Sequence, residues 1–334
     1  MIKIGALTLK HGLCLAPMAG YTDSAMRQIC GRFGAEYAVS EMISAKALCF
    51  EQKSRESAPA RTAALAVMRE ADAPMAIQLF GSEPDFMREA AILIESGAYR
   101  GAVKGPAPAA IDINMGCPVK KIVSNHEGSA LMEKPVLVEK IVSEVKKATH
   151  LPVTVKFRAG IDDNRMNCVE IAKAAEAGGA DALCVHARTR VQMYAPPVRW
   201  EYIRMVKEAV SVPVIGNGGI ESAEDAMRMY EETGCDAIMI GRGAEGNPFI
   251  FRSIRNRMEG KEDAAVTPTE IVDTVLQQIK WMIEDKGDEI AILEARKHIT
   301  WYLKGFRGAP RIREAVNRLN TLAELEELLY GILE

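Results

Sequence analysis

The sequence predicts an α/β protein, a (β/α)8 TIM barrel followed by an all-helical C-terminal domain. Eight short apolar segments alternate with amphipathic helical stretches over about 250 residues, which is the number and spacing of elements in such a barrel. The competing doubly wound sheet would carry a glycine-rich phosphate fingerprint after its first strand, but this strand ends in Pro17-Met18-Ala19-Gly20. We therefore expect the barrel to span residues 1–250 and the helical domain to span residues 251–334.

The expected strands are short apolar runs at residues 13–16, 37–42, 75–79, 110–114, 153–157, 182–186, 214–217 and 237–241. Helix-patterned runs lie between them at residues 135–149, 168–177, 200–210 and 222–233. Ser222 is suited to cap the start of the last run, and Gly178-Gly179 is suited to end the second.

The composition is ordinary for a globular protein of 334 residues, with 48% apolar and 26% charged residues and a net charge of −3. Any nucleic-acid surface would therefore have to be local. The seven cysteines are scattered and include no Cys-x-x-Cys pair, which predicts free thiols in a reducing cytoplasm and argues against a zinc site or disulfide framework. No apolar run approaches the length of a membrane span, so we expect no signal peptide and no membrane anchor. We expect the protein to be a cytoplasmic monomer.

Cys117 follows the fourth expected strand, in the segment Ile111-Asp112-Ile113-Asn114-Met115-Gly116-Cys117-Pro118. The isoleucines alternate with polar residues as in a buried strand, and Gly116 and Pro118 then end it, so the thiol lies at the strand tip. The structural alternative is a small buried cysteine at a turn. The amide of Asn114 and the polar loop that follows favour a functional thiol.

Polar residues recur where the expected strands end, namely Gln78, Asn114, Lys156, Arg158, His186 and Arg188. In a TIM barrel these ends converge on one pocket. Lys156 and Arg158 are two residues apart and share a face of their strand, and two inward cations need an anionic partner. Each of these residues alone could instead belong to a structural ion pair. A ligand with a phosphate and an electron-rich ring, such as FMN, would account for five residues together: Gln78, Lys156, His186, Asn217 and Arg242. A sugar phosphate also fits, with Lys156 as the Schiff-base lysine of an aldolase.

Two glycine-rich turns predict a phosphate site. The segment Gly241-Arg242-Gly243-Ala244-Glu245-Gly246 matches Gly-x-Gly-x-x-Gly, but only helical sequence follows it, so no dinucleotide-binding βαβ unit is completed. In a barrel this turn ends the eighth strand, and Gly216-Asn217-Gly218-Gly219 ends the seventh, where phosphate sites are commonly built. Glycines let backbone N–H groups approach phosphate oxygens, and Arg242 adds charge. Two tight turns without a ligand are the alternative.

Six motifs together resemble one family. From about residue 4 to residue 320 the chain resembles the tRNA-dihydrouridine synthases, most closely the bacterial B-type. The motifs are Ala16-Pro17-Met18-Ala19-Gly20-Tyr21-Thr22-Asp23, Gln78-Leu79-Phe80-Gly81, Asn114-Met115-Gly116-Cys117-Pro118, Lys156-Phe157-Arg158, His186-Ala187-Arg188-Thr189-Arg190 and Gly241-Arg242-Gly243. Three departures concern loops: Gly219 stands where the family usually has Asp, residues 99–109 look like an insertion, and Ala195-Pro196-Pro197 replaces a more usual Ser-Gly.

The resemblance implies an FMN-dependent barrel that reduces specific uridines in tRNA to dihydrouridine with NADPH. Asn114 and Arg158 would face the uracil, and Cys117 would be the catalytic acid. The residues that the resemblance assigns to FMN are Pro17, Met18, Ala19, Gln78, Lys156, His186, Asn217, Gly218, Gly219, Gly241 and Arg242.

The expected mechanism follows from the electronics of uracil. Conjugation of C5=C6 with the C4 carbonyl makes C6 electrophilic, so reduced flavin can deliver hydride to C6 while C5 takes a proton. A thiol with the ordinary pKa of about 8.5 can supply that proton at neutral pH. Because Lys156 and Arg158 would lower this pKa, Cys117 must lie far enough from them, or be screened from them, to stay protonated.

Two functions of other classes are the alternatives. A flavin barrel acting on a free small molecule, such as a dihydroorotate or dihydropyrimidine dehydrogenase, would not need the C-terminal domain. A non-enzymatic RNA-binding barrel would have lost part of the cofactor set, whereas Gln78, Lys156, His186, Asn217 and Arg242 are all present.

The C-terminal domain is expected to bind tRNA. Residues 295–320 contain seven Lys or Arg and one acid, Glu314, whereas the rest of the chain carries 35 basic and 44 acidic residues. Such a local excess suits phosphates, and a solvated basic face with Glu314 paired to Arg311 or Arg318 is the alternative. The residues expected to contact tRNA here are Lys297, Lys304, Arg307, Arg311 and Arg313.

Overall fold

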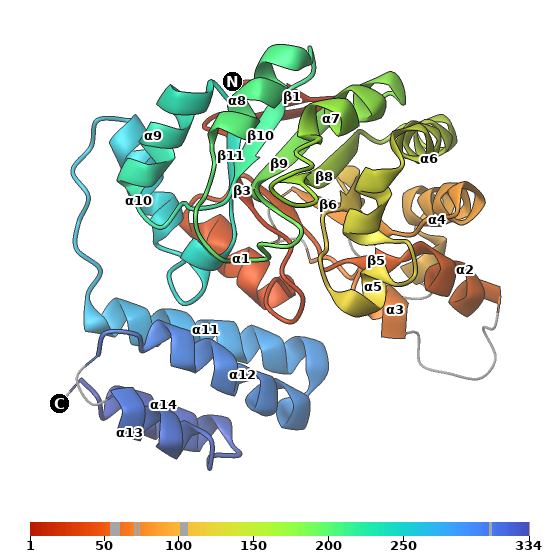
Figure 1. Ribbon diagram of the computed structural model, residues 1–334. Coiled ribbons are helices and arrows are strands. Elements are labelled where there is room, and N and C mark those ends of the chain that lie inside the picture. The colour runs from red at the N-terminus through yellow and green to blue at the C-terminus, as the bar shows by residue number, and fades with distance from the viewer. Residues whose placement is uncertain (54–60, 70–71, 73, 101–105, 307–308, 334) are drawn as a thin grey trace.

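The chain forms a closed parallel barrel flanked by helices, with four further helices at the C-terminal end (Figure 1). The structure is a computed structural model that describes residues 1–53, 61–69, 72, 74–100, 106–306 and 309–333. The barrel strands are β3 (Leu13–Leu15), β4 (Tyr37–Val39), β6 (Met75–Phe80), β7 (Ala110–Met115), β8 (Val153–Gly160), β9 (Ala182–Thr189), β10 (Val214–Asn217) and β11 (Ala237–Ile240). Pairing of β3 with both β4 and β11 closes the barrel, and the eight strands predicted from the sequence are confirmed.

The helices of the barrel begin and end largely where local signals predict. The barrel helices are α1 (Ser24–Phe33), α2 (Ala45–Lys53), α3 (Arg61–Ala64), α4 (Pro84–Ser96), α5 (Lys120–Val123), α6 (Pro135–Ala148), α7 (Cys168–Ala177), α8 (Glu201–Ala209), α9 (Ala223–Thr233) and α10 (Ile250–Met258). Three 3-10 turns accompany them, η1 (Ala98–Arg100), η2 (Gly128–Glu133) and η3 (Arg242–Ala244). Ser222 accepts a hydrogen bond from the Asp225 backbone N–H as the N-cap of α9, and Gly178 ends α7, so both predicted signals are confirmed.

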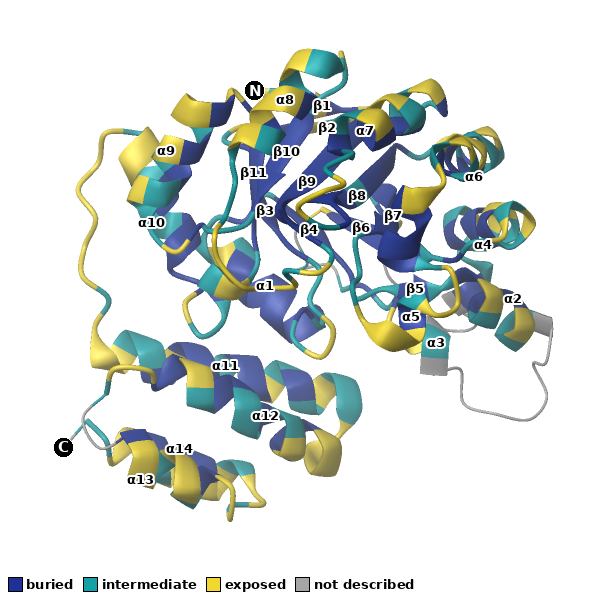
Figure 2. Cartoon of the chain, in the orientation of Figure 1, coloured by how far each residue is buried: buried dark blue, intermediate teal, exposed yellow. Residues whose placement is uncertain are grey.

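Side chains alternate between two apolar layers because successive residues of a strand face opposite sides. The larger layer lies between the strands and the surrounding helices, and a smaller one fills the barrel interior. Figure 2 shows the strands as buried and the outward faces of the helices as exposed. Among the described residues, no helix is long and apolar enough to cross a bilayer.

An N-terminal hairpin that the sequence did not predict closes the barrel at its amino end. Strands β1 (Ile2–Ile4) and β2 (Leu7–Leu9) pair antiparallel. Ile4 and Leu9 are fully buried among the interior residues of the barrel strands. Three-residue strands give too short an alternation to detect, and their partner surface exists only after the barrel closes. A second unpredicted strand, β5 (Ile43–Ser44), extends the edge of β6.

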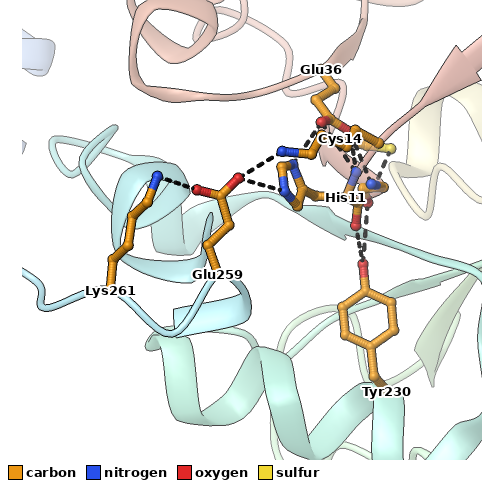
Figure 3. Close-up of polar contacts among 8 residues, drawn as sticks. His11, Cys14, Glu36, Tyr230, Glu259 and Lys261 are labelled. Carbon is orange, nitrogen blue, oxygen red and sulfur yellow. Dashed lines mark hydrogen bonds and ion pairs between the residues drawn. The ribbon is translucent and has the colours of Figure 1, made fainter. Parts of the chain in front are cut away.

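A polar cluster ties this end of the molecule together (Figure 3). The ring of His11 lies between two carboxylates, with Nδ1 2.9 Å from Glu36 and Nε2 3.1 Å from Glu259 at the end of α10. Lys261 pairs with the same Glu259, and the Tyr230 hydroxyl of α9 donates to the His11 carbonyl at 2.9 Å. The cluster therefore joins the loop before β3 to two helices from the far end of the chain.

The C-terminal helices pack on a separate apolar core. They are α11 (Pro268–Lys286), α12 (Asp288–Tyr302), α13 (Ala309–Val316) and α14 (Leu322–Tyr330). The buried residues of α10 instead belong to the barrel core. The division between residues 250 and 251 stays a prediction, and we propose that it be moved to residues 259–267, after α10.

Two close contacts fix the C-terminal helices against the barrel. Gly246 has φ +66°, and a Cβ there would lie 2.3 Å from the carbonyl carbon of Trp301 in α12. Lys286, at the end of α11, donates to Asp23, the N-cap of α1, at 2.6 Å. These contacts bring α12 to the edge of the barrel's carboxyl end.

Candidate active site

One pocket of about 480 Å³ opens at the carboxyl ends of the barrel strands, a volume ordinary for a small-molecule or cofactor site. Fourteen of the residues predicted for the site line it: Pro17, Met18, Ala19, Gln78, Asn114, Cys117, Lys156, Arg158, His186, Asn217, Gly218, Gly219, Gly241 and Arg242. They come from seven strand ends, so barrel closure brings together side chains separated by more than 200 residues.

Lys156 is held at the floor of the pocket by the neighbouring strands. Its Nζ donates to Asn217 Oδ1 at 2.8 Å, and Asn217 Nδ2 donates to the Met239 carbonyl at 2.7 Å. Burial lowers the pKa of Lys156 from its usual value, and the nearby Arg158 acts in the same direction. A negatively charged or electron-rich ligand would therefore stabilise the charged form of Lys156.

The turns after β10 and β11 form one side of the pocket, and there the backbone packs closely against neighbouring side chains. Gly218 has φ +108°, and a Cβ there would lie 2.7 Å from His186 Cδ2, so only glycine fits. The indole N–H of Trp200 donates to the Gly218 carbonyl at 2.9 Å and fixes this turn. Gly219 also has a positive φ, +79°, which an Asp at this position would adopt only with strain.

Positive charge collects on this side of the pocket. Arg158, Arg188 and Arg242 all line it, and Glu221 and Glu245 are its carboxylates. Burial, followed by the nearby cations, lowers the pKa of His186 well below its usual value, so its imidazole is neutral at neutral pH. Burial also lowers the pKa of Arg158 to about 10. The excess of cations favours an anionic group such as a phosphate.

Arg158 also braces the rim of the pocket. Its Nε donates to the Gly116 carbonyl at 2.7 Å, and Nη1 donates to the carbonyls of Thr189 and Met193 at 3.0 and 2.8 Å. The exposed ring of Tyr194 lies 5.8 Å from the Arg158 guanidinium and 4.8 Å from that of Arg242. Arg158 thus joins the loop that carries Cys117 to the loop that carries Tyr194.

Cys117 lies half-buried at the edge of the pocket, where neighbouring groups hold its backbone. Its N–H donates to Asn114 Oδ1 at 3.0 Å, and its carbonyl accepts from the Ser129 hydroxyl at 2.8 Å. Burial raises the pKa of the Cys117 thiol and outweighs the opposing effects of the Val119 backbone and Arg158. The thiol is therefore protonated at neutral pH and able to donate a proton.

The sequence reasoning missed several residues of the pocket wall. Met42 and Glu245 line it, as do three aromatic residues, Tyr21, Tyr194 and Trp301. The indole N–H of Trp301 donates to the Tyr21 hydroxyl at 2.8 Å. Tyr21 lies within a recognised motif and Tyr194 lies four residues after another, so an aromatic residue in or near a motif was the signal that could have found them.

The basic residues of the C-terminal helices lie outside the pocket. Lys297 is near its mouth, with Nζ 5.2 Å from the centre of the Tyr21 ring. Lys304, Arg311 and Arg313 are exposed, and Arg307 lies outside the described residues. Glu314 pairs with Arg318, so it does not neutralise Arg311 through the described contacts.

The family model for dihydrouridine synthase (Dus) matches residues 14–333 of the chain. The chain belongs to this family. It is 39% identical to the tRNA-dihydrouridine synthase B of Vibrio parahaemolyticus, over all of this chain and 99% of that protein. It is 40% identical to the tRNA-dihydrouridine synthase B of Pseudomonas aeruginosa, over 96% of this chain and 92% of that protein. The resemblance read from the six motifs is confirmed, including its B-type character.

The barrel also resembles parts of larger solved structures. Histamine dehydrogenase from Rhizobium sp. 4-9 superposes with a TM-score of 0.56 at 15% identity, covering 89% of this chain and 50% of that chain. A Pseudomonas geniculata amine oxidase acting on 6-hydroxypseudooxynicotine gives a TM-score of 0.58 at 14% identity, over 78% of this chain and 49% of that chain. The chain thus spans about half the length of these two proteins, and the likeness establishes the barrel fold alone.

Proposed function

We propose that this chain reduces uridines in tRNA to 5,6-dihydrouridine, with FMN in the barrel pocket and NADPH as the reductant. The observation that carries the proposal is one pocket that holds a protonated Cys117 thiol beside a cationic, glycine-lined cradle. The tRNA substrate is supported by relatives that carry this activity in their names. A cytoplasmic location is supported by seven free cysteines, six of them buried.

The residues present fit FMN. Gly218, Gly219 and Gly241 leave room for a phosphate to approach backbone N–H groups, and Arg242 supplies charge. Lys156 and Gln78 place N–H donors in the same pocket, where an isoalloxazine edge would accept hydrogen bonds. When bound and reduced, FMN supplies hydride to uracil C6.

The residues of this chain then complete the reaction. Asn114 and Arg158 offer N–H donors at the pocket edge, which suit the carbonyl oxygens of a uracil and would orient C5 towards Cys117. The Cys117 thiol donates its proton to C5, where charge develops. Lifting the uridine out of the folded tRNA costs a few kcal/mol, and the exposed ring of Tyr194 at the rim is available to stack on a base.

The cofactor proposal is tested by colour. We expect purified protein to be yellow, to bleach when NADPH is added without oxygen, and to regain colour when tRNA transcript is added. The tRNA should then contain dihydrouridine by mass spectrometry. Protein that stays colourless after incubation with FMN would disprove the flavin assignment.

The same experiment separates the proposal from an enzyme acting on a free pyrimidine. Trp301 of the C-terminal helices lines the pocket, and a small substrate would not require that domain. Free uridine should therefore leave the bleached flavin unchanged. Rapid recovery of colour with uracil or orotate, which accept two electrons to become dihydrouracil or dihydroorotate, and none with tRNA, would favour the alternative.

Binding of tRNA should depend steeply on salt through the exposed basic residues of the C-terminal helices. Replacing Lys304, Arg311 and Arg313 together by alanine should raise KM for tRNA and flatten the log–log salt slope by about 0.7 to 0.9 for each phosphate that is no longer neutralised. NADPH oxidation by the flavin should not change. Lys140, Lys147 and Lys173 on α6 and α7 provide a control triple of equal charge, which should leave the slope unchanged.

A further inference from the structure

A chain of hydrogen bonds runs beneath the pocket from a buried carboxylate to the backbone of Cys117. Gln78 Nε2 donates to Asp112 Oδ2 at 2.7 Å, and Asn114 Nδ2 donates to Gln78 Oε1 at 2.9 Å. Asn114 Oδ1 then accepts from the N–H groups of Gly116 and Cys117 at 3.1 and 3.0 Å. The chain therefore connects Asp112 to the residue that carries the thiol.

Strand register builds this chain. Gln78 of β6 lies beside Asp112 of β7, and Asp112 lies beside Thr154 of β8, whose hydroxyl donates to Asp112 Oδ1. Asn114 follows Asp112 by two residues and so shares its inward face of β7. Asp112 and Gln78 are each 1% exposed, and only Gln78 and Asn114 reach the pocket.

The direction of every bond is set by the two ends of the chain. A carboxylate only accepts, and a backbone N–H only donates, whereas an amide side chain can face either way. Because Asp112 accepts, Gln78 must present Nε2 to it and Oε1 to Asn114. Asn114 then presents Oδ1 to the two backbone N–H groups, so a single arrangement satisfies all the partners.

We propose that Asp112 is a positioning residue that sets the orientation of Gln78 and Asn114 and thereby holds the Cys117 loop, and its thiol, at the edge of the pocket. The importance of this for catalysis rests on the proposed role of Cys117 as acid. Asp112 touches no substrate, and its effect passes through two amides.

The surroundings of Asp112 allow it to act as a hydrogen-bond acceptor. Burial raises the pKa of Asp112 to about 6, while bonds from Thr154 and Gln78 and the charge of Lys156 act in the opposite direction. A buried carboxylate is unfavourable for folding unless its partners compensate. At neutral pH the group is ionised and can only accept.

Exchanging the side chains of Asp112 and Asn114 tests the inference. Asn114→Asp places acceptors on both sides of Gln78, so no orientation of the Gln78 amide satisfies them and the Cys117 loop should loosen. Adding Asp112→Asn restores a donor: the introduced asparagine donates to Gln78, Gln78 donates to the introduced aspartate, and that aspartate still accepts from the backbone. The double variant should therefore behave more like the parent than Asn114→Asp does.

The readout is alkylation of Cys117 by iodoacetamide, followed by mass spectrometry at a pH where the thiol is fully ionised. The other six cysteines are buried, so Cys117 is the accessible one. Removal of one buried hydrogen bond corresponds to about a tenfold change. We expect Asn114→Asp to react about tenfold faster than the parent, and Asp112→Asn with Asn114→Asp to return close to the parent rate.

Removing the second charge without restoring a donor is the matched control. Asp112→Ala with Asn114→Asp should recover only in part, because Gln78 can then donate to the introduced aspartate while alanine offers no N–H to the Gln78 carbonyl oxygen. Equal recovery in both double variants, or no recovery in the exchange, would overturn the inference. Alkylation needs neither tRNA nor FMN turnover, so these outcomes are independent of whether the parent makes dihydrouridine.

Discussion

Replacing Cys117 by alanine is expected to slow dihydrouridine formation by about 10² to 10⁴-fold, the usual contribution of a general acid. The proton that C5 requires would then have to come from water. FMN content and the rate of flavin reduction by NADPH should stay as in the parent, because the residues proposed to hold the flavin are unchanged. Single-turnover reduction of tRNA by prereduced enzyme measures the step directly.

Two further variants separate acid chemistry from packing at this position. Cys117→Ser keeps the shape of the side chain, but its hydroxyl is a far weaker acid, so it should be nearly as slow as alanine. Val136→Ala removes an exposed side chain from α6, outside the pocket, and should react at the parent rate. A Cys117→Ala enzyme that forms dihydrouridine as fast as the parent would show that the thiol is structural.

Removing the carboxylate of Asp72 is expected to destabilise the barrel by about 3 to 5 kcal/mol, because it leaves a buried cation without its partner. The Arg27 side chain is 2% exposed and that of Asp72 is 1% exposed, with Nη2 3.1 Å from Oδ2. Among the described residues, the other acceptors of Arg27 are neutral carbonyls, those of Thr22 and Val67. Urea denaturation of Asp72→Ala should show a lower midpoint with an unchanged slope.

An exposed ion pair provides the comparison. Glu232 pairs with Arg228 one turn away on α9, and both side chains are about half exposed. Glu232→Ala should change the free energy of unfolding by less than about 0.5 kcal/mol. If Asp72→Ala cost no more than Glu232→Ala, the Arg27 charge would have to be solvated in the folded protein.

The sequence predicted the repeating parts of the molecule well. Strand and helix signals are local, because alternation, caps such as Ser222 and stops such as Gly178 depend on a few neighbouring residues. Motif order was sufficient for the family, and the fourteen barrel residues assigned from it meet in one pocket. Their individual roles stay predictions.

The helical end of the chain was predicted less fully. The excess of positive charge after residue 295 was evident from counting, but the position of Trp301 in the pocket wall was not. That position depends on the close approach of α12 to Gly246, a contact between residues more than 50 positions apart.

The sequence by itself determined the barrel, the family and the set of groups able to bind a phosphate and donate a proton. These follow from local pattern and from which side chains are present. Only the tertiary structure decided which groups are ionised and what they touch: burial keeps the Cys117 thiol protonated despite Arg158, and strand register joins Asp112 to it through two amides. The reason is physical, since desolvation and hydrogen-bond direction depend on neighbours that only the closed barrel brings together.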